Sequence, residues 1–115
     1  MHSMFYGCSG FELLEVGNWD TSNVTNMNSM FNNCRSLYKL DVSKWNTSKV
    51  TNMENMFANL SNVRQLDVTN FDTSNVTIMD GMFGSCPNLQ KIYGTDFVIN
   101  TSSIHNMFDG DVSLV

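Results

Sequence analysis

The hydrophobic positions of this chain recur with a 26-residue period. The most regular mark is a Met-Phe pair that begins at Met4, Met30, Met56, Met82 and Met107, where only the last step is shorter, by a single position. Other apolar positions keep the same period: Trp19, Trp45, Phe71 and Phe97; Leu14, Leu40, Leu66 and Ile92; Phe11, Leu37, Val63 and Leu89. A fixed period of roughly 20–50 residues is typical of repeat proteins, in which each unit buries its apolar face against its neighbours. The pattern predicts a stack of repeats.

The period also predicts the domain organisation. We expect one repeat domain, 1–115, of about four and a half repeats, with units near 1–26, 27–52, 53–78 and 79–103 and a partial unit 104–115. The chain starts and stops inside a unit, because Met1 lies one full period before Met27 and Leu114 matches Leu37. We therefore expect a fragment of a longer protein, whose neighbouring repeats or domains continue the stack.

One part of each repeat has the spacing of a helix face. In the unit that begins at Asp41, the apolar residues are Met53, Met56, Phe57, Leu60 and Val63. Thr51 followed by Glu54 has the form of a capping box at the start of this stretch. We expect a helix of two to three turns over about residues 52–59, stabilised by stacking because so short a helix is unstable alone.

The other part of each repeat has the alternation of a strand. The pattern L-x-x-L-x-V occurs at Leu37, Leu40 and Val42 and again at Val63, Leu66 and Val68. Short strands of this kind can stack in parallel, one from each unit. The two parts together predict an α/β fold: a right-handed leucine-rich-repeat-like solenoid with one short parallel strand and one short helix per 26-residue repeat.

The consensus L-x-x-L-D-V-S-x-W-D-T-S-N-V-T-N-M-x-x-M-F-x-x-C-x-x-L resembles the 26-residue repeat of the bacterial BspA-like leucine-rich-repeat surface proteins. The strings WDTSNVTNM, WNTSKVTNM and FDTSNVTIM recur almost intact, and the resemblance runs from Met4 to Phe108. The last unit, FVINTSSIHNMF, departs from it by losing the T-S-N-V-T string and one residue. The resemblance implies a solenoid at the cell surface or outside the cell, a role in adhesion, and no catalytic residues or cofactors.

Composition narrows the function classes. A net charge of −5 with only six Lys and Arg argues against nucleic-acid binding, which needs clustered cations, and against an anionic membrane surface. No apolar run approaches the ~18 residues of a membrane span, so we expect no membrane insertion by this segment. Charged residues make up 15%, below the ~25% usual in soluble domains, and Asn, Ser and Thr supply the polarity instead. No residue stands out from the repeat as a catalytic group would, so we expect no enzyme.

Sulfur-containing side chains recur at core positions. Cys8, Cys34 and Cys86 share one repeat position, which Leu60 fills in the remaining unit, and this exchange predicts buried free thiols. The methionine columns, Met27, Met53 and Met79 with Met30, Met56 and Met82, could bind a soft metal together with the cysteines. Their spacing predicts core packing instead.

The outward strand positions are the candidate contact surface: Lys39, Asp41, Ser43, Gln65, Asp67, Thr69 and Tyr93. Glu15, Asp41 and Asp67 form a column of carboxylates, which at the ~4.8 Å spacing of strands repel each other unless something offsets their charge. Three interpretations stay open: hydrogen bonds to neighbouring Ser, Thr or Lys side chains, a ligand-facing strip, or a Ca²⁺ site of oxygen ligands.

A second polar group of columns predicts a turn in every repeat. Its members are Asp20, Asn46 and Asp72; Thr21, Thr47 and Thr73; and Ser22, Ser48 and Ser74. Such side chains bond nearby backbone and so favour turns, here between strand and helix. The alternative is a regular array of hydroxyl groups facing water, as in ice-binding solenoids.

These observations predict a non-enzymatic binding or adhesion module. It would present its polar strand face to a protein or glycan partner on a host or matrix surface, where many weak contacts add up. The alternative is a structural spacer or scaffold repeat with no ligand of its own.

Overall fold

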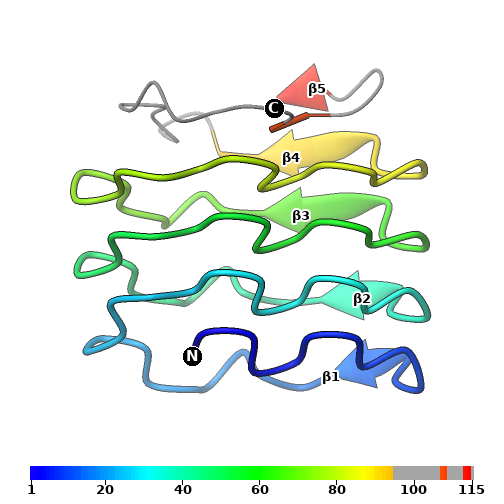
Figure 1. Cartoon of the computed structure of the whole chain (residues 1–115), viewed down its shortest axis with the longest axis horizontal. Helices are drawn as coiled ribbons and strands as arrows, with labels where there is room; N and C mark the ends of the chain where they lie inside the picture. The colour runs from blue at the N-terminus through cyan, green and yellow to red at the C-terminus, as the bar shows by residue number, and fades with distance from the viewer. Residues whose placement is uncertain (95–106, 109–112, 115) are drawn as a thin grey trace.

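The computed structural model describes residues 1–94, 107–108 and 113–114. Figure 1 shows the chain as coils stacked above one another, each coil carrying one short strand. The strands are β1 (Leu13–Leu14), β2 (Lys39–Leu40), β3 (Gln65–Asp67), β4 (Lys91–Tyr93) and β5 (Ser113–Leu114). They pair in parallel, β1 with β2 and, in a second sheet, β3 with β4 and β4 with β5. The departure from the repeat expected within residues 97–108 lies almost entirely outside the described residues.

The register of β1 to β4 follows the repeat of the sequence, whereas that of β5 does not: Leu114 pairs with Ile92, in the column of Leu40, and the expected match of Leu114 to Leu37 is wrong. Leu14 pairs with Leu40, and Leu66 pairs with Ile92. Two isolated bridges outside the strands keep the same offset, from Asn26 to Asn52 and from Asn52 to Ile78. Residues at one repeat position therefore lie above one another in columns, as the 26-residue period predicts.

The predicted helix is wrong. Residues 54–59 form consecutive turns, and Asn52 lies in an isolated bridge. Within the part of the chain that the structure describes no segment is helical, so the α/β fold is corrected to coils of strands and turns. The N–H of Met56 donates to the carbonyl of Met53, and the N–H of Ala58 donates to that of Asn55, both at 3.2 Å. These bonds span three residues, whereas a helix needs bonds that span four.

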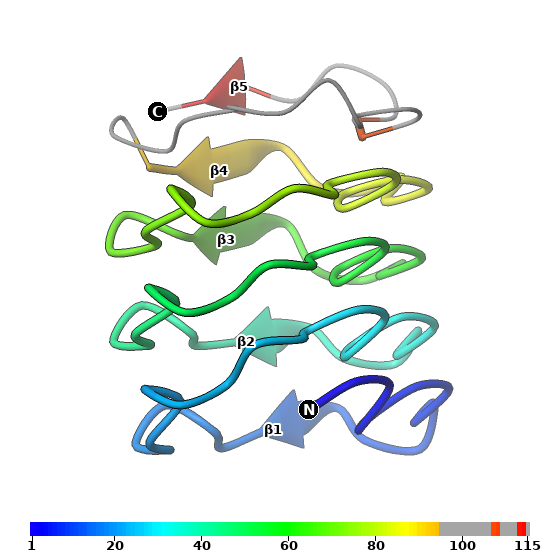
Figure 2. The ribbon, with the colours of Figure 1, turned by 60° about the vertical axis from the view of Figure 1, so that its left-hand side comes forward.

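The N–H groups between these turn bonds point to the next coil. Asn55 donates to the carbonyl of Asp80 at 2.8 Å, and Phe57 donates to that of Met82 at 2.9 Å. Bonds inside the coil and bonds between coils thus alternate along the segment, so its buried backbone is satisfied without a helix. Figure 2 shows these turns of successive coils lying above one another.

A left-handed backbone at two positions of each repeat explains why no helix forms. Ser3, Ser29, Asn55 and Gly81 share one position, with φ between 53° and 63°. Gly7, Asn33, Asn59 and Ser85 share the other, with φ between 55° and 70°. A right-handed helix cannot continue through such residues, and Gly and Asn adopt this conformation at the lowest cost.

The expected capping box is also absent. The Thr51 hydroxyl donates to the carbonyl of Thr25 at 3.1 Å, in the coil before, rather than accepting a bond from its own segment. The N–H of Glu54 donates instead to the Asn52 side chain at 2.8 Å. Thr51 therefore joins two coils, and Asn52 shapes the turn.

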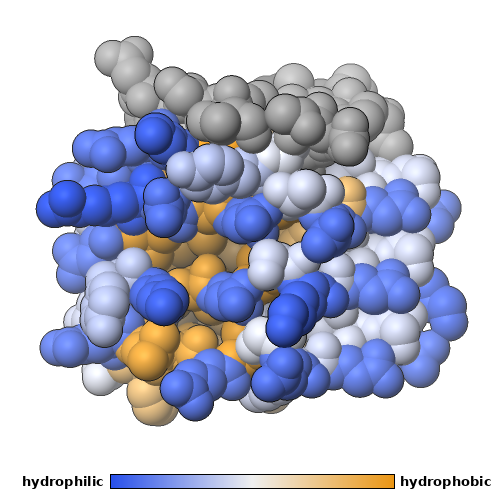
Figure 3. All heavy atoms as spheres, turned by 180° about the vertical axis from the view of Figure 1, so that it is seen from behind, coloured by the Kyte–Doolittle hydropathy of each residue, from blue (hydrophilic) through white to orange (hydrophobic). Residues whose placement is uncertain are grey.

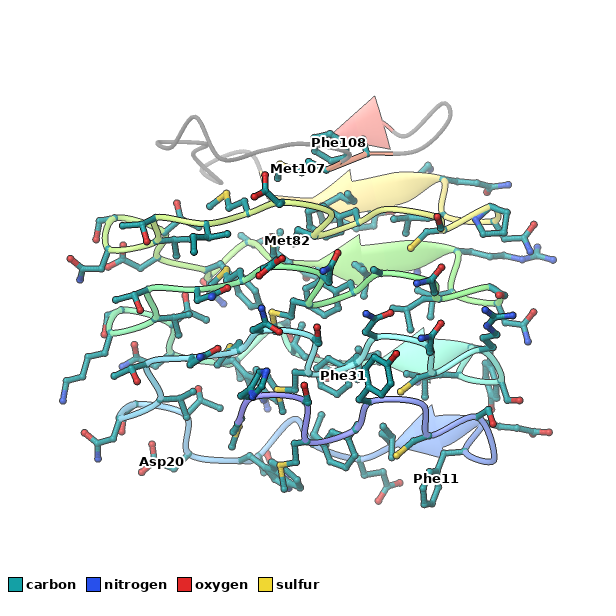
Figure 4. The ribbon with its side chains drawn as sticks, in the orientation of Figure 1. Phe11, Asp20, Phe31, Met82, Met107 and Phe108 are labelled. Carbon is teal, nitrogen blue, oxygen red and sulfur yellow. The ribbon has the colours of Figure 1, made fainter. Side chains whose placement is uncertain are left out.

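The core is built from the apolar columns. The rings of Phe5, Phe31, Phe57, Phe83 and Phe108 form one continuous stack, with centroids 5.5–5.8 Å apart and planes within 10° of parallel. In Figure 4, Phe31 lies inside the coils, whereas Asp20 lies at their rim. Both methionine columns, from Met27 to Met82, are fully buried, so the prediction that they pack in the core is confirmed.

The cysteines are free, as predicted, but the predicted burial is wrong for Cys8, which is only partly buried. Cys34 and Cys86 are buried, and their thiols donate to the carbonyls of Phe5 at 2.9 Å and Phe57 at 3.1 Å. Burial raises the pKa of the Cys34 thiol to about 11.

The columns of small polar residues form a turn, as predicted, although no helix follows it in the described residues. In the first of these turns, Asp20 Oδ1 accepts the N–H of Ser22 at 3.0 Å. The threonine at the next position is buried in each of the first three turns, at Thr21, Thr47 and Thr73. Thr47 Oγ1 donates to the carbonyl of Asp72 at 3.0 Å and accepts the N–H of Asp72 at 2.9 Å. The alternative of an array facing water is therefore wrong for these threonines.

Candidate binding groove on the strand face

The strands divide their residues between the core and one outer face. Leu40, Leu66 and Ile92 point inward and are buried, whereas their neighbours Asp41 and Asp67 are exposed. Because side chains alternate along a strand, the residues on either side of each buried leucine share the outer face. This face carries the columns that the sequence predicts as a contact surface.

A hollow of about 780 Å³ lies on this face, over β2, β3 and β4. We call it the strand-face groove, and its lining residues are Tyr38, Lys39, Leu40, Asp41, Ser43, Asn62, Arg64, Gln65, Leu66, Asp67, Gln90, Lys91 and Tyr93. A second hollow of about 360 Å³ beside β1 shares Lys39 and Asp41 with it, so the two adjoin. Figure 3 shows this side of the molecule, where hydrophilic side chains surround smaller hydrophobic patches.

The structure brings together nearly all the residues chosen from the sequence. Lys39, Asp41, Ser43, Gln65, Asp67 and Tyr93 all line the strand-face groove. Thr69 does not line it, and its N–H donates to Asp67 Oδ1 at 3.0 Å. That bond gives Thr69 a place in the turn after β3.

Several residues that line the strand-face groove were not predicted from the sequence as contact residues. Tyr38, Arg64 and Gln90 belong to one column, the position before the predicted outward residues, and all of them are exposed. Strict alternation would bury this position, because Leu40 and Leu66 two residues later are buried. The sequence does carry a sign that this position is exposed: Glu12, Tyr38, Arg64 and Gln90 form one column, and each of them is polar or amphipathic.

The carboxylates of the groove are held by hydrogen bonds. Asp41 Oδ1 accepts the hydroxyl of Ser43 at 2.6 Å and the N–H of Ser43 at 3.0 Å. These bonds, with smaller contributions from the charges of Lys44 and Lys39, hold the pKa of Asp41 below its ordinary value of 3.8. Hydrogen bonds from the residue two places later thus hold both carboxylates, from the hydroxyl and N–H of Ser43 at Asp41 and from the backbone N–H of Thr69 at Asp67.

The described residues contain no group of three or more His, Cys, Asp or Glu side chains placed to hold a metal ion. Nor do they form a helix long and apolar enough to cross a membrane.

Cations outnumber carboxylates in the groove. Lys39, Arg64 and Lys91 line it beside Asp41 and Asp67, although the whole chain carries a net charge of −5. The groove is therefore locally basic in an acidic protein.

No curated protein and no solved structure matches the chain. A family model described as "Mycoplasma protein of unknown function, DUF285" matches residues 1–114. The match spans every coil described above and the repeats from which they are built. The chain belongs to the DUF285 family.

Proposed function

We propose that this protein is a non-enzymatic binding or adhesion module whose strand-face groove contacts a protein or glycan partner on a host or matrix surface. The groove itself carries the proposal: a hollow of about 780 Å³ lined by exposed polar and aromatic side chains from three successive coils. Its size is within the range of about 300–1,000 Å³ typical of ligand sites. The stacked core holds these side chains in fixed columns, which favours many weak contacts acting together.

The chemistry of the groove favours binding over catalysis. Its lining contains no His or Cys. A general base works best with a pKa near the working pH, whereas hydrogen bonds from Ser43 lower the pKa of Asp41. The repeat's resemblance to BspA-like leucine-rich-repeat surface proteins supports an adhesive role and a location at the cell surface or outside the cell.

A structural spacer is the second candidate. The bonds of Asp41 to Ser43 and of Asp67 to Thr69 favour it, because they give these carboxylates a task inside the repeat. A spacer predicts that substitutions in the groove leave attachment unchanged.

The test is a binding screen against immobilised host and matrix components. The groove variant carries Lys39→Glu and Lys91→Glu, both at exposed positions. The control carries Arg35→Glu and Lys49→Glu, which make the same charge change at exposed positions outside the groove. We expect the parent and the control to bind alike and the groove variant to lose binding, with unchanged thermal melts. Equal binding by all three, or no binding at all, would favour the spacer.

A further inference from the structure

We infer that the strand-face groove binds an acidic saccharide, one that carries carboxylate groups on a hydroxyl-rich chain. The inference rests on the proposed function and names the class of partner. Three properties of the lining support it: exposed aromatic rings, amides that both donate and accept, and a local excess of cations.

The aromatic rings supply flat surfaces on which a sugar ring can lie. Tyr38 lines the groove with 56% of its surface exposed, so its ring is accessible to a ligand. Tyr93 lines it from β4 and is half-buried. A tyrosine combines an apolar face with a polar hydroxyl, so it suits a ligand with C–H groups on one face and hydroxyls at its rim.

The polar side chains match a ligand rich in hydroxyls. Asn62, Gln65 and Gln90 each offer a carbonyl that accepts and an amide that donates. Ser43 and the N–H of Thr69 fix the orientation of Asp41 and Asp67, so these carboxylates can accept hydroxyl groups without first being ordered.

The cations select for negative charge on the ligand. Lys39, Arg64 and Lys91 come from three successive coils, so their charges repeat along the stack. A guanidinium such as that of Arg64 can bind a carboxylate through two parallel hydrogen bonds. A polymer with regularly spaced carboxylates could contact several coils at once, which increases its affinity.

An acidic peptide fits the same face less well. An extended peptide gains affinity by pairing with the free edge of a sheet, whereas β3 is paired on the β4 side and the groove lies on the face of the strands. Apolar anchors of a peptide also need deep pockets, and the inward residues Leu40 and Leu66 are almost completely covered. The saccharide is therefore the better match.

The experiment measures binding of three probes of matched length at about 0.15 M salt, where exposed charges are screened. The probes are an oligomer of hexuronic acid, the same oligomer with its carboxylates reduced to alcohols, and a polyglutamate peptide. The variants are Tyr38→Ala and Arg64→Gln. Their controls are Tyr6→Ala, which has the same 56% exposure, and Arg35→Gln, both outside the groove.

We expect the hexuronate oligomer to bind, with Kd raised roughly tenfold by each groove variant and unchanged by either control. The reduced oligomer should bind at least tenfold more weakly, and the peptide should bind no better than it. Equal binding of acidic and reduced oligomers would overturn the selection for charge. Tighter binding of the peptide, or insensitivity to Tyr38→Ala, would overturn the saccharide.

Different results would contradict the saccharide inference and the proposed binding function. If no saccharide binds but the Lys39→Glu and Lys91→Glu variant still loses a partner found in the screen, only the inference is wrong. If the charge-reversal variant also leaves every interaction unchanged, the groove has no binding role.

Discussion

The indole N–H of Trp45 donates a hydrogen bond of 2.9 Å to the backbone carbonyl of Val16, in the coil before it. Trp45 is 1% exposed, so this bond joins two coils inside the core. Trp19 holds the same repeat position in the first coil and is only partly buried, and Phe71 holds it in the third. The column therefore accommodates a phenylalanine ring, which cannot make the bond.

Replacing Trp45 with Phe should lower the free energy of unfolding by about 1–2 kcal/mol. In the variant the Val16 carbonyl still accepts the backbone N–H of Trp19 at 3.1 Å, so it is not left without a hydrogen bond. Urea melts of Trp45→Phe and of the control Trp19→Phe measure the difference. Equal losses would show that ring size, and not the bond, matters in this column.

The buried hydroxyl of Thr47 should matter more than the exposed one of Thr51. Thr47→Val removes both part-buried bonds to the Asp72 backbone, which costs about 1–3 kcal/mol. Thr51→Val removes one exposed bond to Thr25 and should change stability by less than about 0.5 kcal/mol. In urea melts, a loss of about 1 kcal/mol or more for Thr51→Val would contradict this and favour a helix cap at Thr51.

Gly81 and Asn55 should couple. They occupy the same left-handed column in neighbouring coils, and a Cβ added to Gly81 would overlap Asn55 Oδ1. Gly81→Ala should therefore destabilise the parent by about 1–2 kcal/mol and cost less in an Asn55→Gly background, where that atom is gone. Additive effects in the double-mutant cycle would contradict the contact.

Acid should destabilise the protein through its turn carboxylates. Hydrogen bonds from the serine two residues later hold the pKa values of Asp20, Asp41 and Asp72 below 3.8. A lowered folded pKa gives stability that is complete above the unfolded pKa and is lost as the pH falls through the folded one. We expect Tm to fall from about pH 4 downward. Replacing all three with Asn should make that fall shallower, since Asn46 forms the same turn with Ser48.

The thiols should differ in reactivity. Cys34 is buried with a pKa of about 11, so almost none of it is thiolate at neutral pH. Cys8 is only partly buried. A thiol reagent in native buffer should label Cys8 first and reach Cys34 and Cys86 only in denaturant. Rapid labelling of Cys34 in the folded protein would contradict its burial.

The sequence predicts the stacking well because the 26-residue repeat period equals the offset between paired residues of neighbouring coils. Once Leu40 lies above Leu14, the columns up to β4 follow, including the methionine core and the Asp20 turns. The register changes at β5, where Leu114 pairs with Ile92. The helix was mispredicted because consecutive turns that span three residues also return the chain to one side, as a helix does. The distinguishing signal was the column of Ser29, Asn55 and Gly81, small residues that tolerate positive φ.

The groove was predictable only in part. Residues next to a buried leucine, such as Asp41 and Gln65, follow from strand alternation. Tyr38 and Arg64 do not, because the strands are so short that alternation does not extend to the position before β2 and β3. Which side chains bond to one another is also invisible in the pattern, and Asp41 with Ser43 is an example.

The alternating bonds between coils have a consequence for changes in chain length. The N–H of Phe57 donates to the carbonyl of Met82 and the N–H of Phe31 donates to that of Met56, with the same offset along the chain, so the turn segments of these successive coils meet through the same contacts. Duplicating or deleting a whole repeat would join surfaces that already match. Inserting a single residue within this turn segment would shift its later positions by one place and turn the aromatic ring out of the stack. The step from Met82 to Met107 is one residue shorter than the others, yet the rings of Phe83 and Phe108 still stack with centroids 5.5 Å apart. The turn segment should therefore resist single insertions, whereas a change of one residue elsewhere in the coil is tolerated.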